Sequence, residues 1–377
     1  MEPVSVLPLL YQHGMTEFKK IAVLCNYELS PERVGGMDYF FWQFDSKCAA
    51  NGIQVDWFFP NQSDHGEYVA LTIFDSGHQS VENYFLSFCK TNATAYTHII
   101  THFIELCTPF FCKIKQFSAA KIITIDHNPR PLSGYPLKKR IEKRIKGILF
   151  SRYISVFVGV SDYTVNEIIS DFGSVVKKKM LTIYNGVVFE DILQRTNRSM
   201  IHPRFLTASH LRESKGIQDL IAAVAMLPTA IQKEIKIDLY GDGPYKSILF
   251  EKMKHHNVTH CFTFMGSSPH LKTIFSNYDY MLQPTHMECF SLSILESLAA
   301  NVPVITTNVG GNEEVIVSGE NGYIYKAKDV LALKDILEDV YLGQKKIETN
   351  TRTLVEQCFS MTAMVDHHFS LVLQNKS

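Results

Sequence analysis

Short, continuous apolar runs alternate with longer amphipathic stretches along the chain. The runs are rich in Ile, Val and Phe and lack polar alternation, which is typical of parallel strands buried on both faces. Stretches with helical spacing of apolar residues lie between most of them, for example 37–51, 216–227 and 330–342. This order of strands and helices predicts an α/β protein built on doubly wound, Rossmann-like parallel sheets.

The predicted strands fall into two groups. The first comprises KIAVLCN, IQVDWFF, HIITH, KIITI, ISVFVGV and MLTIY, and the second RFLTAS, IKIDLYG, CFTFMG, DYMLQ, PVITT and GYIYK. A polar segment, 189–202, separates them. We therefore expect an N-terminal domain over 1–190, a C-terminal domain over 191–358, and a last segment, 359–377, whose helix could pack back on the first domain. Two such domains facing each other form a cleft, where ligands usually bind.

Composition limits the class of protein. The chain has 377 residues, of which 46% are hydrophobic and 20% charged, as in ordinary globular proteins of roughly two domains. No apolar run approaches the roughly 18–20 residues of a membrane helix, and the N-terminus lacks the basic segment of a signal peptide. Eight cysteines without a C-x-x-C motif predict reduced thiols rather than disulfides or zinc ligands. We expect a cytoplasmic protein.

The formal net charge of −1 hides a basic segment. Between residues 113 and 152, eleven Lys or Arg oppose only Asp126 and Glu142. One interpretation is a solvated helix face. The other is a peripheral contact of 138–152 with an anionic membrane surface, at the inner face of the membrane. The lysines singled out for that contact are Lys138, Lys139, Lys143 and Lys146. Nucleic acid is not expected as a partner, because no aromatic-interleaved basic motif accompanies the charges.

Glycine turns are candidate phosphate sites, but most of them have simpler explanations. The chain has no G-x-x-x-x-G-K-[ST] motif, and Gly241-Asp-Gly243 lacks the third glycine of a dinucleotide fingerprint, which favours a strand-end turn. Gly35-Gly36, before the helix predicted from residue 37, is either a plain turn or a backbone contact for an anionic ligand. Because no D-x-D pair occurs, we expect no metal site.

The segment 279–316 carries the most chemical information. It predicts a strand, Pro284, a loop, a helix beginning near Ser291, and a second strand followed by two glycines. Free backbone amides at that helix start could bind a diphosphate. Glu288 precedes the helix and Glu296 lies within it, so two carboxylates could accept hydrogen bonds from hydroxylated groups on either side of the diphosphate.

This segment resembles the E-x7-E region of retaining glycosyltransferases of the GT-B fold, family 4 (glycosyl transferases group 1). The matching residues are Pro284, Glu288, Phe290, Leu292, Leu295, Glu296, Ala299, Pro303, Val304, Ile305, Gly310, Gly311, Glu314, Val315 and Ile316. LSPERVGGMDYF, VGVSDYT, YNGV, HLRESKG and LYGDGP resemble further family segments in the same order. The resemblance extends over roughly 21–324.

The resemblance implies roles for individual residues. Lys215 would bind the donor diphosphate, Glu296 the donor ribose and Glu288 the transferred sugar. His127 would face that sugar, unless it is a structural strand-end histidine; His102 and Glu105 could line the acceptor side, although a structural role is favoured. Glu288, His127 and Lys215 are thus the catalytic candidates. The donor-binding candidates are Gly35, Gly36, His210, Arg212, Lys215, Gly266, Cys289, Phe290, Ser291, Leu292 and Glu296. No cofactor is implied.

The implied function is retaining transfer of a sugar from a UDP- or GDP-sugar to a glycan or lipid-linked acceptor, in cell-surface polysaccharide or glycolipid synthesis. The chain departs from the family pattern at Ser209-His210, where Gly-Arg is usual, and at Cys289 and Ser291, which replace glycines. A histidine is only partly cationic near neutral pH. The alternative is therefore a non-catalytic relative that binds a nucleotide-sugar or serves as a scaffold.

Overall fold

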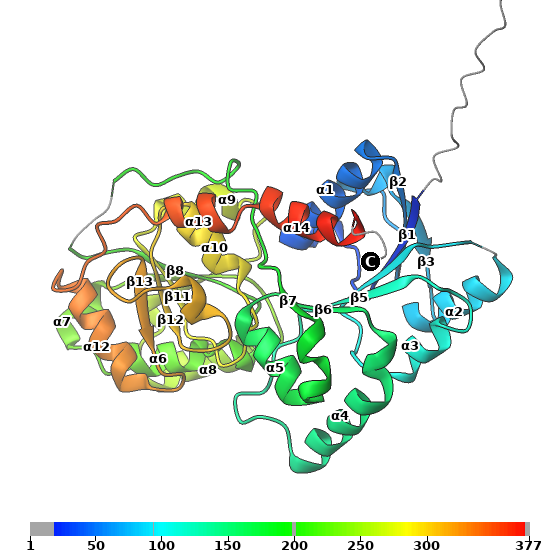
Figure 1. Cartoon of the computed structure of the whole chain (residues 1–377). Coiled ribbons are helices and arrows are strands. Elements are labelled where there is room, and N and C mark those ends of the chain that lie inside the picture. The colour runs from blue at the N-terminus through cyan, green and yellow to red at the C-terminus, as the bar shows by residue number, and fades with distance from the viewer. Residues whose placement is uncertain (1–18, 93, 198–200, 374–377) are drawn as a thin grey trace, which may run out of the picture.

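The computed structural model describes residues 19–92, 94–197 and 201–373, which form two parallel β-sheets with helices packed on both faces (Figure 1). The first sheet has seven strands in the order β3-β2-β1-β4-β5-β6-β7. They are β1 (Lys19–Cys25), β2 (Ile53–Phe59), β3 (Thr72–Asp75), β4 (His98–His102), β5 (Lys121–Asp126), β6 (Val156–Gly159) and β7 (Met180–Thr182). We call this half of the molecule the N-terminal unit.

The second sheet, in the C-terminal unit, has six strands in the order β10-β9-β8-β11-β12-β13. They are β8 (Phe205–Ala208), β9 (Ile237–Tyr240), β10 (Phe262–Gly266), β11 (Tyr280–Gln283), β12 (Val304–Thr307) and β13 (Gly322–Tyr325). The two sheets thus share one topology. In each, the first strand lies between the second and the fourth, and the direction of winding reverses there.

The helices connect and cover these strands. Those of the N-terminal unit are α1 (Gly36–Ala50), α2 (Val81–Thr91), α3 (Pro109–Ile114), α4 (Leu137–Phe150) and α5 (Asp162–Phe172). Those that follow are α6 (Ile217–Ala225), α7 (Thr229–Glu234), α8 (Lys246–His255), α9 (Leu271–Ile274), α10 (Leu292–Ala299), α11 (Asn312–Val315), α12 (Val330–Tyr341), α13 (Arg352–Cys358) and α14 (Met361–Leu373). No helix within the described ranges has the length and apolarity needed to cross a membrane.

The α/β fold with two Rossmann-like sheets, predicted from the sequence, is confirmed, and every strand predicted there is present. The pattern does not predict β3, because its four residues lie at a sheet edge and none of them is buried. In open parallel sheets, ligands bind outside the carboxyl ends of the strands where the winding reverses. The fold therefore favours a ligand near the loops that follow β1, β4, β8 and β11.

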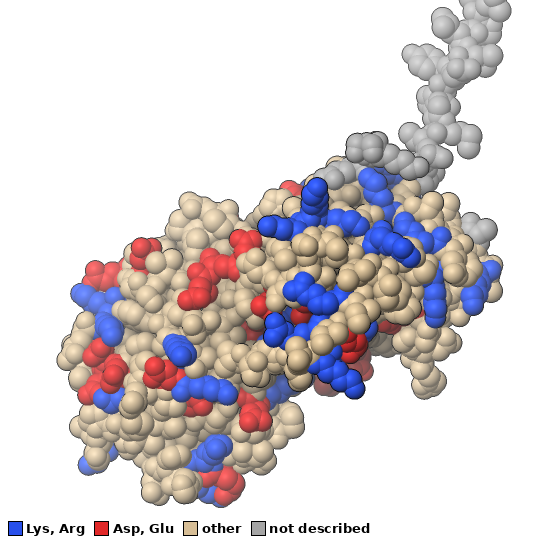
Figure 2. All heavy atoms as spheres, turned by 60° about the horizontal axis from the view of Figure 1, so that its bottom comes forward, with Lys and Arg blue, Asp and Glu red and all other residues tan. Residues whose placement is uncertain are grey.

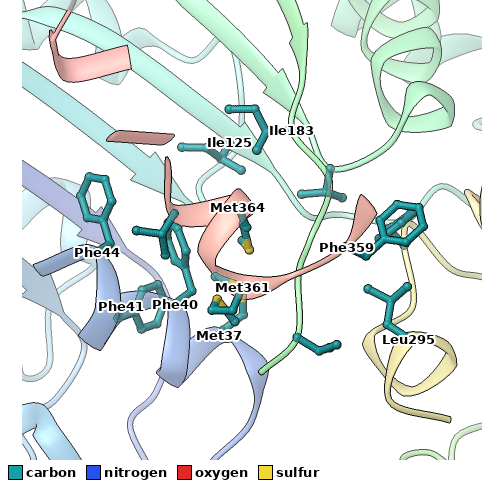
Figure 3. Packing of buried hydrophobic residues seen from close by; sticks show 14 of the residues in the cluster. Met37, Phe40, Phe41, Phe44, Ile125, Ile183, Leu295, Phe359, Met361 and Met364 are labelled. Carbon is teal, nitrogen blue, oxygen red and sulfur yellow. The ribbon is translucent and has the colours of Figure 1, made fainter. Parts of the chain in front are cut away.

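A continuous cluster of buried apolar side chains connects the two units. Figure 3 shows part of it, where α1 and α14 face each other and Leu295 of α10 lies near Phe359. Met361 and Met364 of α14 lie on the side of that helix toward α1, and an ion pair between Lys47 and Asp366 joins the same two helices. After the C-terminal unit, the last described helix, α14, thus lies on the N-terminal one (Figure 1).

Candidate active site

Lys215 is positioned by a tight turn after β8. The next residue, Gly216, has φ +70°, and a Cβ there would lie 1.7 Å from the carbonyl oxygen of Pro284. Only glycine fits this left-handed conformation and this close approach. The approach packs the turn against the loop after β11, where the amide of His286 donates to the carbonyl of Ser214 at 2.8 Å. The two loops at the point of reversal are thereby joined.

Lys215 and Glu288 form an ion pair across this junction. The distance between Lys215 Nζ and Glu288 Oε2 is 2.8 Å, and the two side chains are 22% and 17% exposed. The second carboxylate oxygen, Oε1, accepts a hydrogen bond from the amide of Cys289 at 3.3 Å. Two residues predicted separately, one for a diphosphate and one for a sugar, are therefore in direct contact.

Helix α10 begins next to this pair and directs its N-terminus into the same loop region. The Ser291 hydroxyl caps the helix by accepting from the amide of Ile294, and it is held by the Nε2 of Gln283 at 2.6 Å. The amides of Leu292 and Ser293 belong to the first turn, where a helix supplies no carbonyl partner. Together with the helix dipole, these amides favour an anionic ligand at this position.

Glu296 lies on α10, five residues beyond the Ser291 cap, and is partly buried. Burial raises the pKa of its carboxyl to about 7, against the opposing effect of the nearby Lys272 ammonium group. Glu296 is therefore present in both protonation states near neutral pH. Above that pH its carboxylate acts only as an acceptor, which suits a pair of adjacent hydroxyls.

The Gly35-Gly36 loop after β1 contacts the start of α10 across the two units. A Cβ on Gly36 would lie 2.8 Å from Cδ1 of Leu292, so the absence of a side chain permits this approach. The loop is held by Asp38, which the sequence analysis does not single out. Asp38 Oδ2 accepts from the Gly35 amide at 2.8 Å, and its Oδ1 accepts from the Tyr68 hydroxyl at 2.6 Å.

His127 follows β5 and belongs to a cluster of rings at the carboxyl ends of β4 and β5 in the first sheet. Its Nε2 lies 3.0 Å from Nδ1 of His102, and its ring stacks on Phe103 with centroids 4.3 Å apart. Burial lowers the pKa of His127 to about 3, with a raising effect from Asp126 and a lowering one from His368. Burial also holds the pKa of His102 well below its usual range. Both imidazoles are neutral at physiological pH and can act only as hydrogen-bond partners there.

Other predicted donor contacts lie on the loop after β8 and at the end of β10. His210 and Arg212 are exposed on the segment that leads to Lys215. A Cβ on Gly241 would lie 2.0 Å from the carbonyl oxygen of Ser209, so the Gly-Asp-Gly turn packs directly on that segment. Gly266, at the end of β10, has φ +74° and accepts from the amide of Gly241 at 2.8 Å.

The side chains of Cys289 and Phe290 are buried. The Phe290 ring contacts Tyr184 and Phe359, with centroids 5.1 and 5.5 Å away, and burial raises the pKa of the Cys289 thiol well above its usual range. Both side chains thus pack between the units. If these residues contact a ligand, they do so through the backbone.

The comparison with known families identifies the chain. Residues 188–353 match the family model described as Glycosyl transferases group 1. This region of the chain belongs to that family. Its activity is the transfer of a sugar from a nucleotide-sugar, and the GT-B fold expected from the sequence resemblance is confirmed.

Curated relatives of this group 1 glycosyltransferase catalyse several reactions. N-acetyl-alpha-D-glucosaminyl L-malate synthase of Bacillus anthracis is 25% identical over 262 residues, which are 61% of this chain and 68% of the relative. The capsular polysaccharide biosynthesis glycosyltransferase CapM of Staphylococcus aureus is 24% identical over 266 residues, 61% of this chain and 67% of CapM. For glycogen synthase of Mycobacterium tuberculosis, the match is 29% identical but spans only 37% of this chain and 35% of the synthase.

Solved structures show the same fold for the group 1 glycosyltransferase as a whole. Anabaena HepE, in a crystal structure with UDP-glucose, has a TM-score of 0.71 at 17% identity and covers 94% of this chain and 99% of its own. The likeness extends over both units, whereas the family model is confined to 188–353. The arrangement of the N-terminal unit relative to the C-terminal one is therefore a property of the fold.

Glu314 makes a contact between the two units that was not predicted from the sequence. Its Oε2 accepts from the amide of Asp162 at 2.9 Å and its Oε1 from the amide of Tyr163 at 2.7 Å. These amides open α5 of the N-terminal unit, and Glu314 lies on α11 of the C-terminal unit. Glu314 matches the family motif, but nothing in its spacing indicates a partner 151 residues earlier. In the described part of the group 1 glycosyltransferase, no group of three His, Cys, Asp or Glu is arranged to hold a metal ion.

Proposed function

We propose that the chain is a retaining transferase that moves a sugar from a UDP- or GDP-sugar to a glycan or lipid-linked acceptor, in cell-surface polysaccharide or glycolipid synthesis. The observation that carries this proposal is the Lys215–Glu288 ion pair beside the first turn of α10, where the winding of the second sheet reverses. HepE, which binds UDP-glucose, and CapM, a capsular polysaccharide enzyme, support the donor and the pathway class.

In the proposed reaction, breaking the anomeric bond leaves negative charge on the departing diphosphate. The Lys215 ammonium and the amides of Leu292 and Ser293 lie where they would stabilise that charge as it develops. A bound diphosphate would compete with Glu288 for Lys215 and would release the Glu288 carboxylate toward the sugar hydroxyls. The family's retaining outcome is explained by acceptor attack from the face of the leaving group.

His127 would orient the transferred sugar as a neutral ring. Its low pKa excludes an imidazolium at physiological pH, so it would stabilise positive charge on the sugar only through hydrogen bonds. The N-terminal domain, 1–190, would bind the acceptor and the C-terminal domain, 191–358, the donor. His102 would then keep His127 in place rather than contact the acceptor itself.

Two substitutions test the assignment. Lys215→Ala and Glu288→Gln should each lower kcat/KM for sugar transfer about 10²- to 10³-fold, the range observed when one preorganised charge-stabilising contact is removed. Lys334→Ala on α12 is the matched control, because Lys334 is also paired with carboxylates but lies on another face of the C-terminal unit. If Lys215→Ala and Glu288→Gln both retain the parental transfer rate, the proposal is wrong.

Ser209-His210 stands where the family usually has Gly-Arg, and this departure motivates a test of the non-catalytic alternative. A thermal-shift screen against UDP, GDP, ADP and their sugar conjugates would identify the nucleotide base of the donor, since a ligand stabilises the folded state by mass action. Donor binding without hydrolysis or transfer would identify a binding or scaffold protein. His210→Arg, which restores the usual family residue, should then increase the thermal shift.

A further inference from the structure

Helix α4 carries a row of aliphatic side chains on its outer face. Residues spaced by three, four and seven positions share one face of a helix, so these side chains form a single stripe. We call this stripe the α4 ridge, and its members are Leu137 (69% exposed), Ile141 (52%), Ile145 (51%), Ile148 (66%) and Leu149 (48%). In Figure 1, α4 lies at the outer edge of the N-terminal unit.

Packing on the opposite side of α4 fixes the ridge toward solvent. Lys143 and Gly147 are the buried residues of the helix. Lys143 Nζ pairs with Asp171 at 2.9 Å, and Asp171 also pairs with Arg130. A Cβ on Gly147 would lie 2.3 Å from the carbonyl oxygen of Phe172, so α4 and α5 approach closely there. Rotating α4 to hide the ridge would bury cations and break these contacts.

Cationic side chains border the ridge. By helical spacing, Lys138 lies at one edge, and Arg140 and Arg144 lie at the other. None of the three has an ion pair with any residue that the structure describes. The short helix after Gly173, at 174–179, packs against α4 and adds further lysines. Figure 2 shows Lys and Arg gathered on the N-terminal unit, whereas both charge signs are mixed on the C-terminal one.

The ion pairs of α4 rule out two of the four lysines from which the sequence predicted an electrostatic membrane contact. Of the four lysines singled out there, Lys143 is buried, and Lys146 pairs with Glu105 at 2.9 Å and with Glu142 at 2.8 Å. Neither can meet a surface in front of α4. Charge alone therefore does not describe this face, because it also presents the exposed apolar side chains of the α4 ridge.

We propose that the α4 ridge inserts into the headgroup–acyl boundary of an anionic lipid bilayer. A helix that presents aliphatic side chains outward between cations has the amphipathic character of helices that lie in this interface. Two copies of the chain meeting through this face would bring α4 cations against each other, because a two-fold contact joins identical patches. An anionic bilayer complements both the apolar ridge and its cationic borders. The proposal does not depend on which sugar or acceptor the enzyme uses.

Co-sedimentation of the full chain with vesicles tests the proposal. Vesicles of phosphatidylcholine alone are compared with vesicles that also contain phosphatidylglycerol. The parental chain should bind the anionic vesicles, and added salt should weaken the binding. Ile141→Ser with Ile145→Ser should lower the partition coefficient more than about 10-fold, since each buried methylene contributes to insertion. Ile248→Ser with Leu331→Ser is the matched control, because these side chains of the C-terminal unit are exposed to a similar extent (47% and 60%).

A fluorescence measurement separates insertion from adsorption. The tryptophan emission of Ile145→Trp should shift to shorter wavelength on anionic vesicles, and that of Leu331→Trp should not. Circular dichroism shows whether each variant is folded. The proposal is overturned if the parental chain does not sediment, if the ridge variant binds as well as the parent, or if Ile145→Trp shows no shift. It is also overturned if the ridge variant instead dissociates a dimer of the parental chain.

Discussion

At the scale of single residues, Glu296 carries a stability cost that should depend on pH. Its folded pKa is about 7, whereas an unfolded chain releases the proton near 4.5. Between these values the folded state binds more protons, so stability falls as pH rises through this window and the loss is complete above it. Glu296→Gln cannot ionise, and at pH 8 it should raise the free energy of unfolding by up to about 3 kcal/mol.

Thermal denaturation at two pH values checks the effect of Glu296→Gln. The variant should be more stable than the parent at pH 8, and the difference should largely vanish at pH 5. Glu313→Gln, an exposed glutamate on α11, is the control and should show no such dependence. A difference in melting temperature that is the same at both pH values would contradict the assigned pKa.

The same residue should link donor affinity to pH. If Glu296 accepts hydrogen bonds from the ribose hydroxyls, only its carboxylate form binds well. The KM for the donor should therefore fall between pH 6 and pH 8 in the parent and stay flat in Glu296→Gln. A parental KM that is constant over this range would remove Glu296 from the donor site, without affecting the stability prediction.

At the scale of elements, the contact of α4 with α5 depends on one glycine. Gly147→Ala would place a methyl group 2.3 Å from the carbonyl oxygen of Phe172, and the helices would have to separate. Such overpacking typically costs about 1–3 kcal/mol. Ile148→Ala, one position along, removes an exposed side chain and should change stability little. Urea denaturation compares the two, and equal midpoints would show that α4 accommodates the methyl group.

The same helix shows how much of the fold the sequence predicts. The alternation of apolar runs predicts the strands of both sheets, and the basic segment 138–152 coincides closely with α4. Which face of α4 is buried could not be predicted. That face is chosen by Asp171 and Phe172 on α5, more than 20 residues beyond the helix, and no periodicity within 137–150 indicates them.

For the candidate site, the sequence likewise indicates which residues belong together but not the contacts between them. Family motifs place Lys215 and Glu288 in the same site, and the structure brings their side chains within 2.8 Å although they are 73 positions apart. The ion pair itself follows from the Gly216 turn against Pro284, a tertiary contact. No sequence motif marks Asp38, which holds the Gly35 loop, as a residue of the site, because a lone aspartate near a helix start is usually only a cap.

At the scale of the whole molecule, Glu314 holds the two units together at the start of α5. One carboxylate accepts two backbone amides of the other unit, and it also meets the positive end of the helix dipole. Charge-assisted hydrogen bonds of this kind contribute about 1.5–3 kcal/mol. The Ser161 hydroxyl, which donates to the carbonyl of Cys289 at 3.3 Å, adds a second contact close by. These polar contacts act together with the apolar cluster that connects the two units.

Glu314→Gln should loosen this arrangement while each unit stays folded. The amide nitrogen of glutamine cannot accept, so one of the two α5 amides would lose its partner and the charge interaction would disappear. A loss of about 2 kcal/mol shifts the equilibrium between closed and open arrangements roughly 30-fold toward the open one. Small-angle X-ray scattering should show a larger radius of gyration, and the KM for the donor should rise, because the Gly36 loop would leave Leu292. Glu313→Gln, on the same helix but exposed, should change neither quantity. A Glu314→Gln protein with the parental radius and KM would show that the apolar contacts of α14 with α1 hold the units together without this carboxylate.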